Sequence, residues 1–92
     1  FGNVKVDLNK HLILKNKKEF KINNTEKTIL ELMINSPGKP FTRDEIGKMI
    51  KIDKERSIDV VITRLRKKIE QDPKNPKYLQ TLRGEGYVLW IE

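Results

Sequence analysis

The hydrophobic residues of this chain change their spacing along the sequence, and the order of these changes limits the folds it can adopt. Near the start, Val4, Val6 and Leu8 alternate with polar residues, which is typical of a half-buried strand. Two more short apolar runs follow at 11–14 and 20–22, each preceded by residues that favour turns. The first 22 residues therefore predict a small antiparallel sheet.

The spacing becomes helical from Asn23 onward. Two segments match capping boxes, in which a polar cap is followed three residues later by glutamate. These are Asn23 with Glu26, before a predicted helix over 24–35, and Thr42 with Glu45, before a second helix over 43–50. In the second helix we expect Ile46, Met49 and Ile50 to face the interior. A third helix is predicted from residue 56 or 57 to about 71, where the prolines within 72–76 end it.

The chain ends in two strand-like runs, 79–82 and 87–91, joined by the turn Arg83-Gly84-Glu85-Gly86. Strands, three helices and a closing hairpin, in this order, outline an α+β winged helix-turn-helix fold. In this fold the third helix and the hairpin, or wing, would contact a partner. We expect one domain over 1–92, with an N-terminal antiparallel sheet in 1–22, a three-helix core in 23–78 and a C-terminal β-hairpin wing in 79–92.

Composition restricts the classes of function. The 92 residues include 20 basic and 13 acidic ones, for a formal net charge of +7, and no cysteine. The absence of cysteine excludes disulfides, thiolate nucleophiles and cysteine-ligated metals. No apolar run is long enough to span a bilayer, so we expect a cytoplasmic module with an anionic partner and no membrane contact. Because the chain begins at Phe1 without a methionine, we expect it to be part of a longer protein.

The predicted third helix has an apolar side and a basic side. At about 100° per residue, one side collects five apolar residues that we expect to be buried. These are Ile58, Val61, Ile62, Leu65 and Ile69, and the opposite side carries Arg56, Val60, Thr63, Arg64 and Lys67. Residues 56–68 hold five basic residues against the single acid Asp59, a net +4 that is more than half of the excess charge of the chain.

The basic side has the composition of a surface that lies in the DNA major groove. That groove admits one α-helix, and arginine can hydrogen-bond guanine edges or hold phosphates. Val60, an apolar residue on a polar side, suits contact with a thymine methyl group. Two simpler interpretations stay open, namely a basic helix face that is only solvated and an isolated surface valine.

The closing hairpin supplies a second predicted contact. Arg83 begins the turn, from which an arginine can enter the minor groove, where the negative potential attracts it. Thr81 and Tyr87 flank the turn, and their hydroxyl groups can hydrogen-bond phosphates. In the alternative interpretation Tyr87 is a half-buried strand aromatic, and Gly84 and Gly86 serve only the turn.

An enzyme and a different binding module are the alternatives from other classes. The single histidine, His11, has no evident acid–base partner, and Gly84-Glu85-Gly86 lacks the remaining glycine and the following helix of a dinucleotide loop. We therefore expect no enzyme activity, no metal and no cofactor. A winged helix that binds RNA or an acidic protein is the other alternative. Single-stranded RNA is disfavoured because the third helix has no aromatic residue for base stacking.

Several blocks of the sequence resemble one known family. Residues 56–70, Arg-Ser-Ile-Asp-Val-Val-Ile-Thr-Arg-Leu-Arg-Lys-Lys-Ile-Glu, are followed by Asp-Pro-Lys-Asn-Pro at 72–76 and Thr-Leu-Arg-Gly-Glu-Gly-Tyr at 81–87. Residues 35–46, Asn-Ser-Pro-Gly-Lys-Pro-Phe-Thr-Arg-Asp-Glu-Ile, resemble the turn and second helix of the same family. Together the blocks resemble the C-terminal DNA-binding effector domain of OmpR/PhoB-type response regulators, over essentially the whole chain.

The resemblance implies more than the residue pattern does. The family has a four-stranded N-terminal sheet, and its members bind double-stranded DNA and activate or repress transcription. The resemblance implies three sets of DNA contacts. The residues that would face bases are Asp59, Val60 and Arg64, and the residue that would approach the minor groove is Arg83. Those that would lie near the DNA backbone are Arg56, Ser57, Thr63, Arg66, Lys67, Thr81 and Tyr87.

Partners are also implied by the resemblance. Family members usually bind direct repeats as head-to-tail pairs, and we expect the isolated domain to be a monomer until DNA pairs it. RNA polymerase is an implied partner, and a two-component phosphorelay is the implied control. The sequence departs from the family at the connector 51–56, which is short and lacks the tryptophan-glycine often found there, and this affects the predicted polymerase contact. No phosphoacceptor aspartate pocket is present in this sequence, so control by phosphorylation requires a longer chain.

Overall fold

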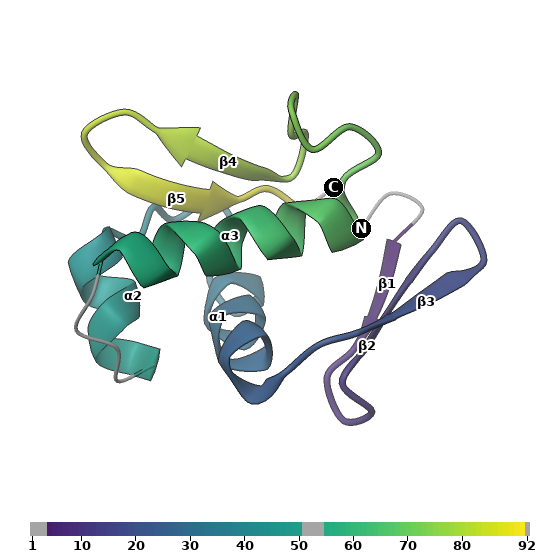
Figure 1. Cartoon of the computed structure of the whole chain (residues 1–92). Coiled ribbons are helices and arrows are strands. Elements are labelled where there is room, and N and C mark those ends of the chain that lie inside the picture. Colours follow the sequence, from purple (N-terminus) through teal and green to yellow (C-terminus); the bar gives the residue numbers. More distant parts are fainter. Residues whose placement is uncertain (1–3, 51–54, 92) are drawn as a thin grey trace.

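The computed structural model describes residues 4–50 and 55–91, with the side chains of 55–57 outside the description. In chain order it contains β1 (Val4–Asp7), β2 (Leu12–Lys15), β3 (Lys18–Lys21), α1 (Asn24–Ile34), α2 (Arg43–Ile50), α3 (Glu55–Ile69), β4 (Leu79–Leu82) and β5 (Gly86–Leu89). Figure 1 shows α3 running between the β4–β5 hairpin and the pair α1 and α2, with the N-terminal sheet beside the C-terminal end of α3. This arrangement confirms the predicted α+β winged helix.

The N-terminal sheet is an antiparallel meander in the order β1-β2-β3. Asn16 and Lys17 form the turn between β2 and β3, and both have positive φ, 53° and 65°, as a two-residue type I′ turn requires. This tight turn lets β3 start at Lys18, earlier than the sequence predicts. β2 starts at Leu12 instead of residue 11, because His11 has a left-handed φ of 54°. The resemblance implies four strands, and the described residues form three in this sheet.

Both predicted capping boxes form. The Asn23 side chain accepts a hydrogen bond from Glu26 N at 2.8 Å, and the Glu26 carboxylate accepts one from Asn23 N at 3.0 Å. Thr42 and Glu45 make the same reciprocal pair at 3.1 and 3.0 Å. Because these bonds satisfy amides that have no partner inside the helices, they fix where α1 and α2 begin.

The prediction is wrong for one residue of α2 that was expected in the core. Met49 is 54% exposed, whereas Ile46 is fully buried and Ile50 is half-buried. The buried residues of α2 are Ile46 and Gly47, so the buried side of the helix is centred between them. Met49 lies roughly 110° around the helix from that centre, and it therefore faces solvent.

The apolar stripe of α3 is buried as predicted. Its five members, Ile58, Val61, Ile62, Leu65 and Ile69, belong to the hydrophobic core together with residues of α1, α2, the N-terminal sheet and the wing. Full burial of a side chain of this size contributes roughly 1.5–3 kcal/mol. This stripe sets the rotation of α3 about its own axis, and with it the set of residues that face away from the core.

The C-terminal end of α3 is held by charged groups. The helix ends at Ile69, two residues earlier than predicted, and the buried Glu70 carboxylate accepts hydrogen bonds from the backbone amides of 77–79 at 2.7–3.2 Å. The Lys15 ammonium of β2 donates to the Lys67 and Glu70 carbonyls at 2.9 and 2.8 Å. A cation there satisfies free carbonyls and suits the negative end of the helix dipole.

The wing is joined to the helical core along one edge. β4 and β5 pair antiparallel with Thr81 opposite Tyr87, and Tyr87 also exchanges two backbone hydrogen bonds of 2.8 Å with Phe41. Gly86 is required at this junction, because it has a φ of +107° and a Cβ there would lie 2.0 Å from the Phe41 carbonyl oxygen. The turn residues 83–85 are exposed.

Candidate nucleic-acid interface

One side of α3 faces solvent along most of the helix. We call it the outer face and define it by Val60, Thr63, Arg64 and Lys67, all exposed, with Val60 at 43%. Together with Asp59 these residues line a shallow groove of about 440 Å³. The predicted placement of these four side chains is confirmed, and Arg56 and Ser57, predicted beside them, lie outside the described side chains.

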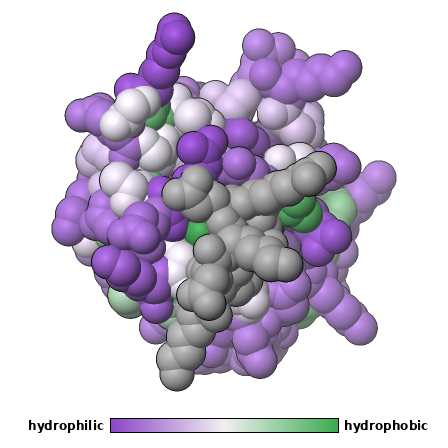
Figure 2. All heavy atoms as spheres, turned by 60° about the vertical axis from the view of Figure 1, so that its left-hand side comes forward, coloured by the Kyte–Doolittle hydropathy of each residue, from purple (hydrophilic) through white to green (hydrophobic). Residues whose placement is uncertain are grey.

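The outer face offers two cations. Within the described residues, the Arg64 and Lys67 side chains make no ion pair and no hydrogen bond. The Thr63 hydroxyl donates to the Asp59 carbonyl at 2.9 Å, inside the helix. Val60 adds an apolar group between these polar ones. Figure 2, which brings forward the side of the molecule that carries α2, shows a predominantly hydrophilic surface with small hydrophobic spots.

Asp59 sits where α3, α2 and the wing meet. Its Oδ1 accepts a hydrogen bond from Arg43 Nε at 2.7 Å and another from the Tyr87 hydroxyl. Partial desolvation acts to raise the pKa of Asp59, but the hydrogen bonds from Tyr87 and Arg43 lower it below the ordinary value. Desolvation, followed by the bond to Asp59, raises the pKa of Tyr87, so its hydroxyl stays a donor at neutral pH.

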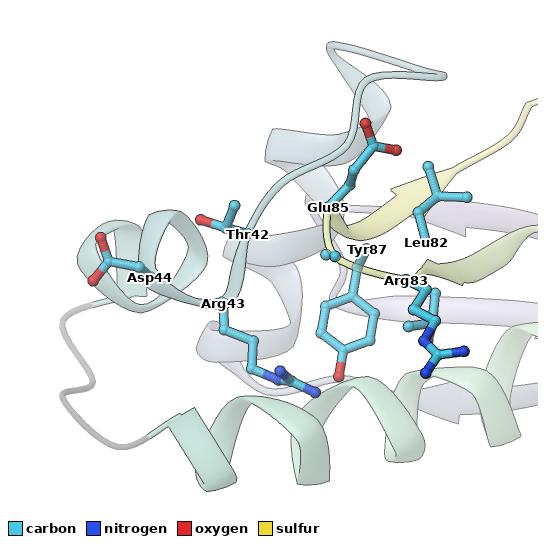
Figure 3. Close-up of a pocket in the computed structure, with 10 residues that line it drawn as sticks. Thr42, Arg43, Asp44, Leu82, Arg83, Glu85 and Tyr87 are labelled. Atoms are coloured by element: carbon cyan, nitrogen blue, oxygen red, sulfur yellow. The ribbon is translucent and has the colours of Figure 1, made fainter.

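Arg43, the first residue of α2, is a member of this cluster that the sequence analysis missed. Its guanidinium lies 5.9 Å from the centre of the Tyr87 ring, and the hydrogen bond to Asp59 raises its pKa further. In Figure 3 the Arg43 and Tyr87 side chains both extend toward α3. The signal in the sequence is only an arginine after a helix cap, and its meaning depends on how α2 crosses α3.

A second groove separates the start of α2 from the wing. It has a volume of about 450 Å³ and is lined by residues 42–44 and 81–87 (Figure 3). Arg83, the predicted minor-groove residue, is exposed on this turn, and Gly84 beside it has open space around it. The turn also carries the exposed acid Glu85. The groove therefore connects Arg43 with the tip of the wing.

The other predicted backbone contacts are engaged within the chain. Arg66 donates from Nε to the Leu79 carbonyl at 2.9 Å and from a terminal amino group to the Thr81 hydroxyl at 2.7 Å. Tyr87 is only 5% exposed, and its hydroxyl bonds to Asp59. Thr81 itself is exposed. The structure thus brings Arg66, Thr81 and Tyr87 together at the base of the wing.

Two kinds of feature are absent from the described residues, namely a cluster of metal ligands and an apolar helix of membrane-spanning length. No group of three or more histidine, aspartate or glutamate residues among them is placed to hold a metal ion. No helix in the described part of the chain has the length and apolar character needed to cross a bilayer. His11 Nε2 lies 3.0 Å from Asn24 Oδ1, a contact between two surface side chains.

Comparison with known proteins identifies the family. The family model described as transcriptional regulatory protein, C terminal, matches residues 17–89. The probable transcriptional regulator ycf27 of Porphyridium aerugineum is 39% identical over 94 residues, which cover 95% of this chain and 39% of that protein. The ycf27 protein of Cyanophora paradoxa is 38% identical with the same coverage. The chain spans about two fifths of the length of these curated relatives.

Solved structures give the same assignment. The DNA-binding domain of response regulator AdeR, solved in complex with an intercistronic region, has a TM-score of 0.75 at 31% identity, covering 98% of this chain and 96% of that one. DrrB of Thermotoga maritima, an OmpR/PhoB homologue, has a TM-score of 0.85 at 32% identity, covering 98% of this chain and 42% of that one. With its sheet, three helices and wing, this chain belongs to the family of C-terminal DNA-binding domains of OmpR/PhoB-type response regulators.

Proposed function

We propose that this chain binds double-stranded DNA sequence-specifically as the effector domain of a two-component response regulator, and so regulates transcription in the cytoplasm. The observation that carries the proposal is the outer face of α3, where one exposed valine and two cations without a partner among the described residues lie beside a wing whose turn carries an exposed arginine. The AdeR domain, which is similar over nearly the whole chain, was solved in complex with an intercistronic region.

The outer face of α3 fits the major groove. An α-helix with side chains is about 10–12 Å wide, and the major groove is about 12 Å wide. In this arrangement Arg64 hydrogen-bonds a guanine edge and Val60 contacts a thymine methyl group. The Asp59 Oδ1 is occupied by Arg43 and Tyr87, and within the described residues its Oδ2 accepts no hydrogen bond, so Oδ2 is left to accept from a cytosine or adenine amino group.

Residues around this face would hold the DNA backbone. Lys67 and Thr63 are exposed on α3, and Thr81 is exposed on the wing. Arg56, Ser57 and Tyr87 stay in the proposal by resemblance, although Tyr87 is bonded within the fold. The resemblance implies the same contact for Arg66, whose side chain is bonded to the wing. We add Arg43, because its exposed guanidinium lies between α3 and the groove beside the wing. Arg83 would enter the minor groove next to the major groove that holds α3.

The proposed assembly and control are those that the family resemblance implies. We propose that two copies bind direct repeats head to tail, that the isolated domain is a monomer, and that RNA polymerase is contacted from the bound complex. Because the chain spans two fifths of its curated relatives, phosphorylation of another part of a longer protein would supply the control.

Selection of bound duplexes from a random pool tests the proposed function. We expect an enriched motif that occurs twice with one spacing, since a head-to-tail pair fixes the distance between half-sites. One unrepeated motif would support specific binding by a single copy. Binding without enrichment would leave only a nonspecific basic surface, and an absence of binding at about 50 mM salt, where phosphate contacts are strong, would overturn the proposal.

A further inference from the structure

We propose that Arg66 is a positioning residue that ties the wing to α3 and thereby places Arg83. This assignment replaces the backbone contact that the family resemblance implies for Arg66. The proposal rests on the proposed function, because it takes Arg83 to meet the minor groove while α3 lies in the major groove.

The first argument is the geometry of the Arg66 side chain. Its Nε donates to the Leu79 carbonyl at 2.9 Å, and its terminal amino group donates to the Thr81 hydroxyl at 2.7 Å. The guanidinium also lies 5.7 Å from the centre of the Tyr87 ring. One planar group therefore contacts both strands of the hairpin, at the register pair Thr81–Tyr87. Such a fixed two-point bond needs the fork of an arginine, which a lysine cannot reproduce.

The second argument is the position of β4 in the wing. β5 is held on its outer edge by the backbone bonds between Phe41 and Tyr87. Within the described residues β4 pairs only with β5, and its first residue is anchored because Leu79 N donates to the buried Glu70 carboxylate at 2.7 Å. Among the described side chains of α3, Arg66 is the one that hydrogen-bonds to β4, and its bond to Thr81 lies nearer the turn. Arg83 directly follows β4, two residues after Thr81. Loss of the Arg66 bond to Thr81 would therefore free the turn end of β4 and shift Arg83, while Glu70 keeps the start of the strand in place.

The third argument is a comparison with the next residue along the helix. Lys67 is exposed and, within the described residues, has no side-chain partner. Arg66 is half-buried, and two of its nitrogen atoms donate hydrogen bonds to the wing. A guanidinium that is already bonded and stacked gains less from a phosphate than a free ammonium does, because its existing bonds must be weakened or given up. Lys67 is therefore the better phosphate contact and the natural control.

The main test is Arg66→Lys, which keeps the charge and removes the fork. Binding is measured to two duplexes of about 24 base pairs that share the selected half-site and differ only in A·T or G·C base pairs under the wing. We expect Arg66→Lys to lose most of the preference for the A·T flank, as Arg83→Ala does, and to keep the wild-type salt dependence. The double variant Arg66→Lys/Arg83→Ala should prefer the A·T flank no less than Arg83→Ala alone.

The opposite results are expected if Arg66 contacts the DNA backbone instead. If Arg66 held a phosphate, Arg66→Lys would keep the flank preference, and Arg66→Gln would lower the slope of log K against log salt by about 0.9. Lys67→Gln is the matched control, and it should lower that slope while the flank preference is retained. The proposal is overturned if Arg66→Gln behaves like Lys67→Gln.

Hydrogen exchange in the free protein gives a readout that does not depend on DNA. Arg66→Lys, and separately Thr81→Val, should make the β4–β5 amides exchange about fivefold faster, the factor that one lost hydrogen bond corresponds to, with α1 amides unchanged. Wild-type exchange in both variants would overturn the proposal. If Arg83→Ala leaves the flank preference intact, the minor-groove role fails and exchange alone decides the role of Arg66. If the wild-type chain binds no duplex, the proposed function falls separately.

Discussion

Four basic residues lie close together near the end of α3, and the fold uses them in two ways. Arg64 and Lys67 extend from the outer face without a partner among the described residues, whereas Arg66 and Lys68 bond to the wing and to the N-terminal region. Residues three apart share a helix face, and residues two apart do not. The comparison teaches that charge alone does not mark an interface, since a cation that is already bonded to oxygen atoms of the fold gains less from a partner than an unbonded one does.

Two glycines of the wing also differ in how closely the fold packs around them, and we expect the largest loss of stability at the one that is packed. Gly86→Ala places a Cβ 2.0 Å from the Phe41 carbonyl at a φ of +107°, so strain and overpacking together should lower the free energy of unfolding by roughly 4 kcal/mol. Gly84→Ala, at a φ of +79° in open space, should cost about 1 kcal/mol. Urea denaturation measures both, and equal losses would remove the distinction between the tip and the base of the wing.

Lys68→Met should give the next largest loss. The Lys68 ammonium donates to both oxygens of the buried Glu26 carboxylate at 2.9 and 2.8 Å, and to the Lys21 carbonyl. Removing one partner leaves a buried charge, which lowers the free energy of unfolding by about 3 kcal/mol. Lys48→Met is the control, because its pair with Asp44 is exposed and contributes less than about 0.5 kcal/mol. Lys68→Met should leave the salt dependence of DNA binding unchanged, and a changed slope would move Lys68 to the interface.

Arg64→Ala should affect binding and not stability. We expect a loss of about 1–3 kcal/mol at the selected site and a relaxed preference at one base pair. The urea midpoint should not change, because the side chain is exposed and has no partner in the part of the chain that the structure describes. Titration against a panel of single-base variants of the site measures this. An unchanged ranking of the panel would show that Arg64 does not contact bases.

Lys67→Ala should weaken binding by a similar factor on every duplex. The expected signature is a salt slope lower by about one unit, with the base preferences retained. Fluorescence anisotropy between about 50 and 200 mM salt measures the slope, a range over which phosphate contacts change affinity strongly. A change in base preference without a change in slope would reverse the roles of Lys67 and Arg64.

Asp59→Asn should lower the stability only slightly, and the effect should depend on pH. Because the pKa of Asp59 is lowered from 3.8 in the folded chain, its charged form stabilises the fold above the unfolded pKa, and this stabilisation is lost as pH falls through the folded pKa. The pair with Arg43 is half-exposed, so the difference between wild type and Asp59→Asn should stay below about 1 kcal/mol at pH 7. Unfolding measured from pH 7 to pH 2 should show the two chains converge, and a constant difference would exclude this ion pair as its source.

Much of the site could be predicted because it depends on local rules. Helical periodicity alone placed Val60, Thr63, Arg64 and Lys67 outside and the stripe from Ile58 to Ile69 inside. Capping boxes fixed the starts of α1 and α2. The predicted burial of Met49 was wrong, because the elements that pack on a short helix decide which of its sides is buried. In α2 that side is centred on Ile46 and Gly47, and Met49 lies away from it.

The amino-acid sequence by itself determined the order of elements, the faces of α3 and the family, because these depend on residue spacing and short-range hydrogen bonds. Only the tertiary structure decided which charges remain available. Arg43 meets Asp59 across 16 residues, Arg66 meets Thr81 across 15, and Lys68 meets Glu26 across 42. Such pairs form when helices and strands cross at particular angles, and those angles result from how the whole core packs.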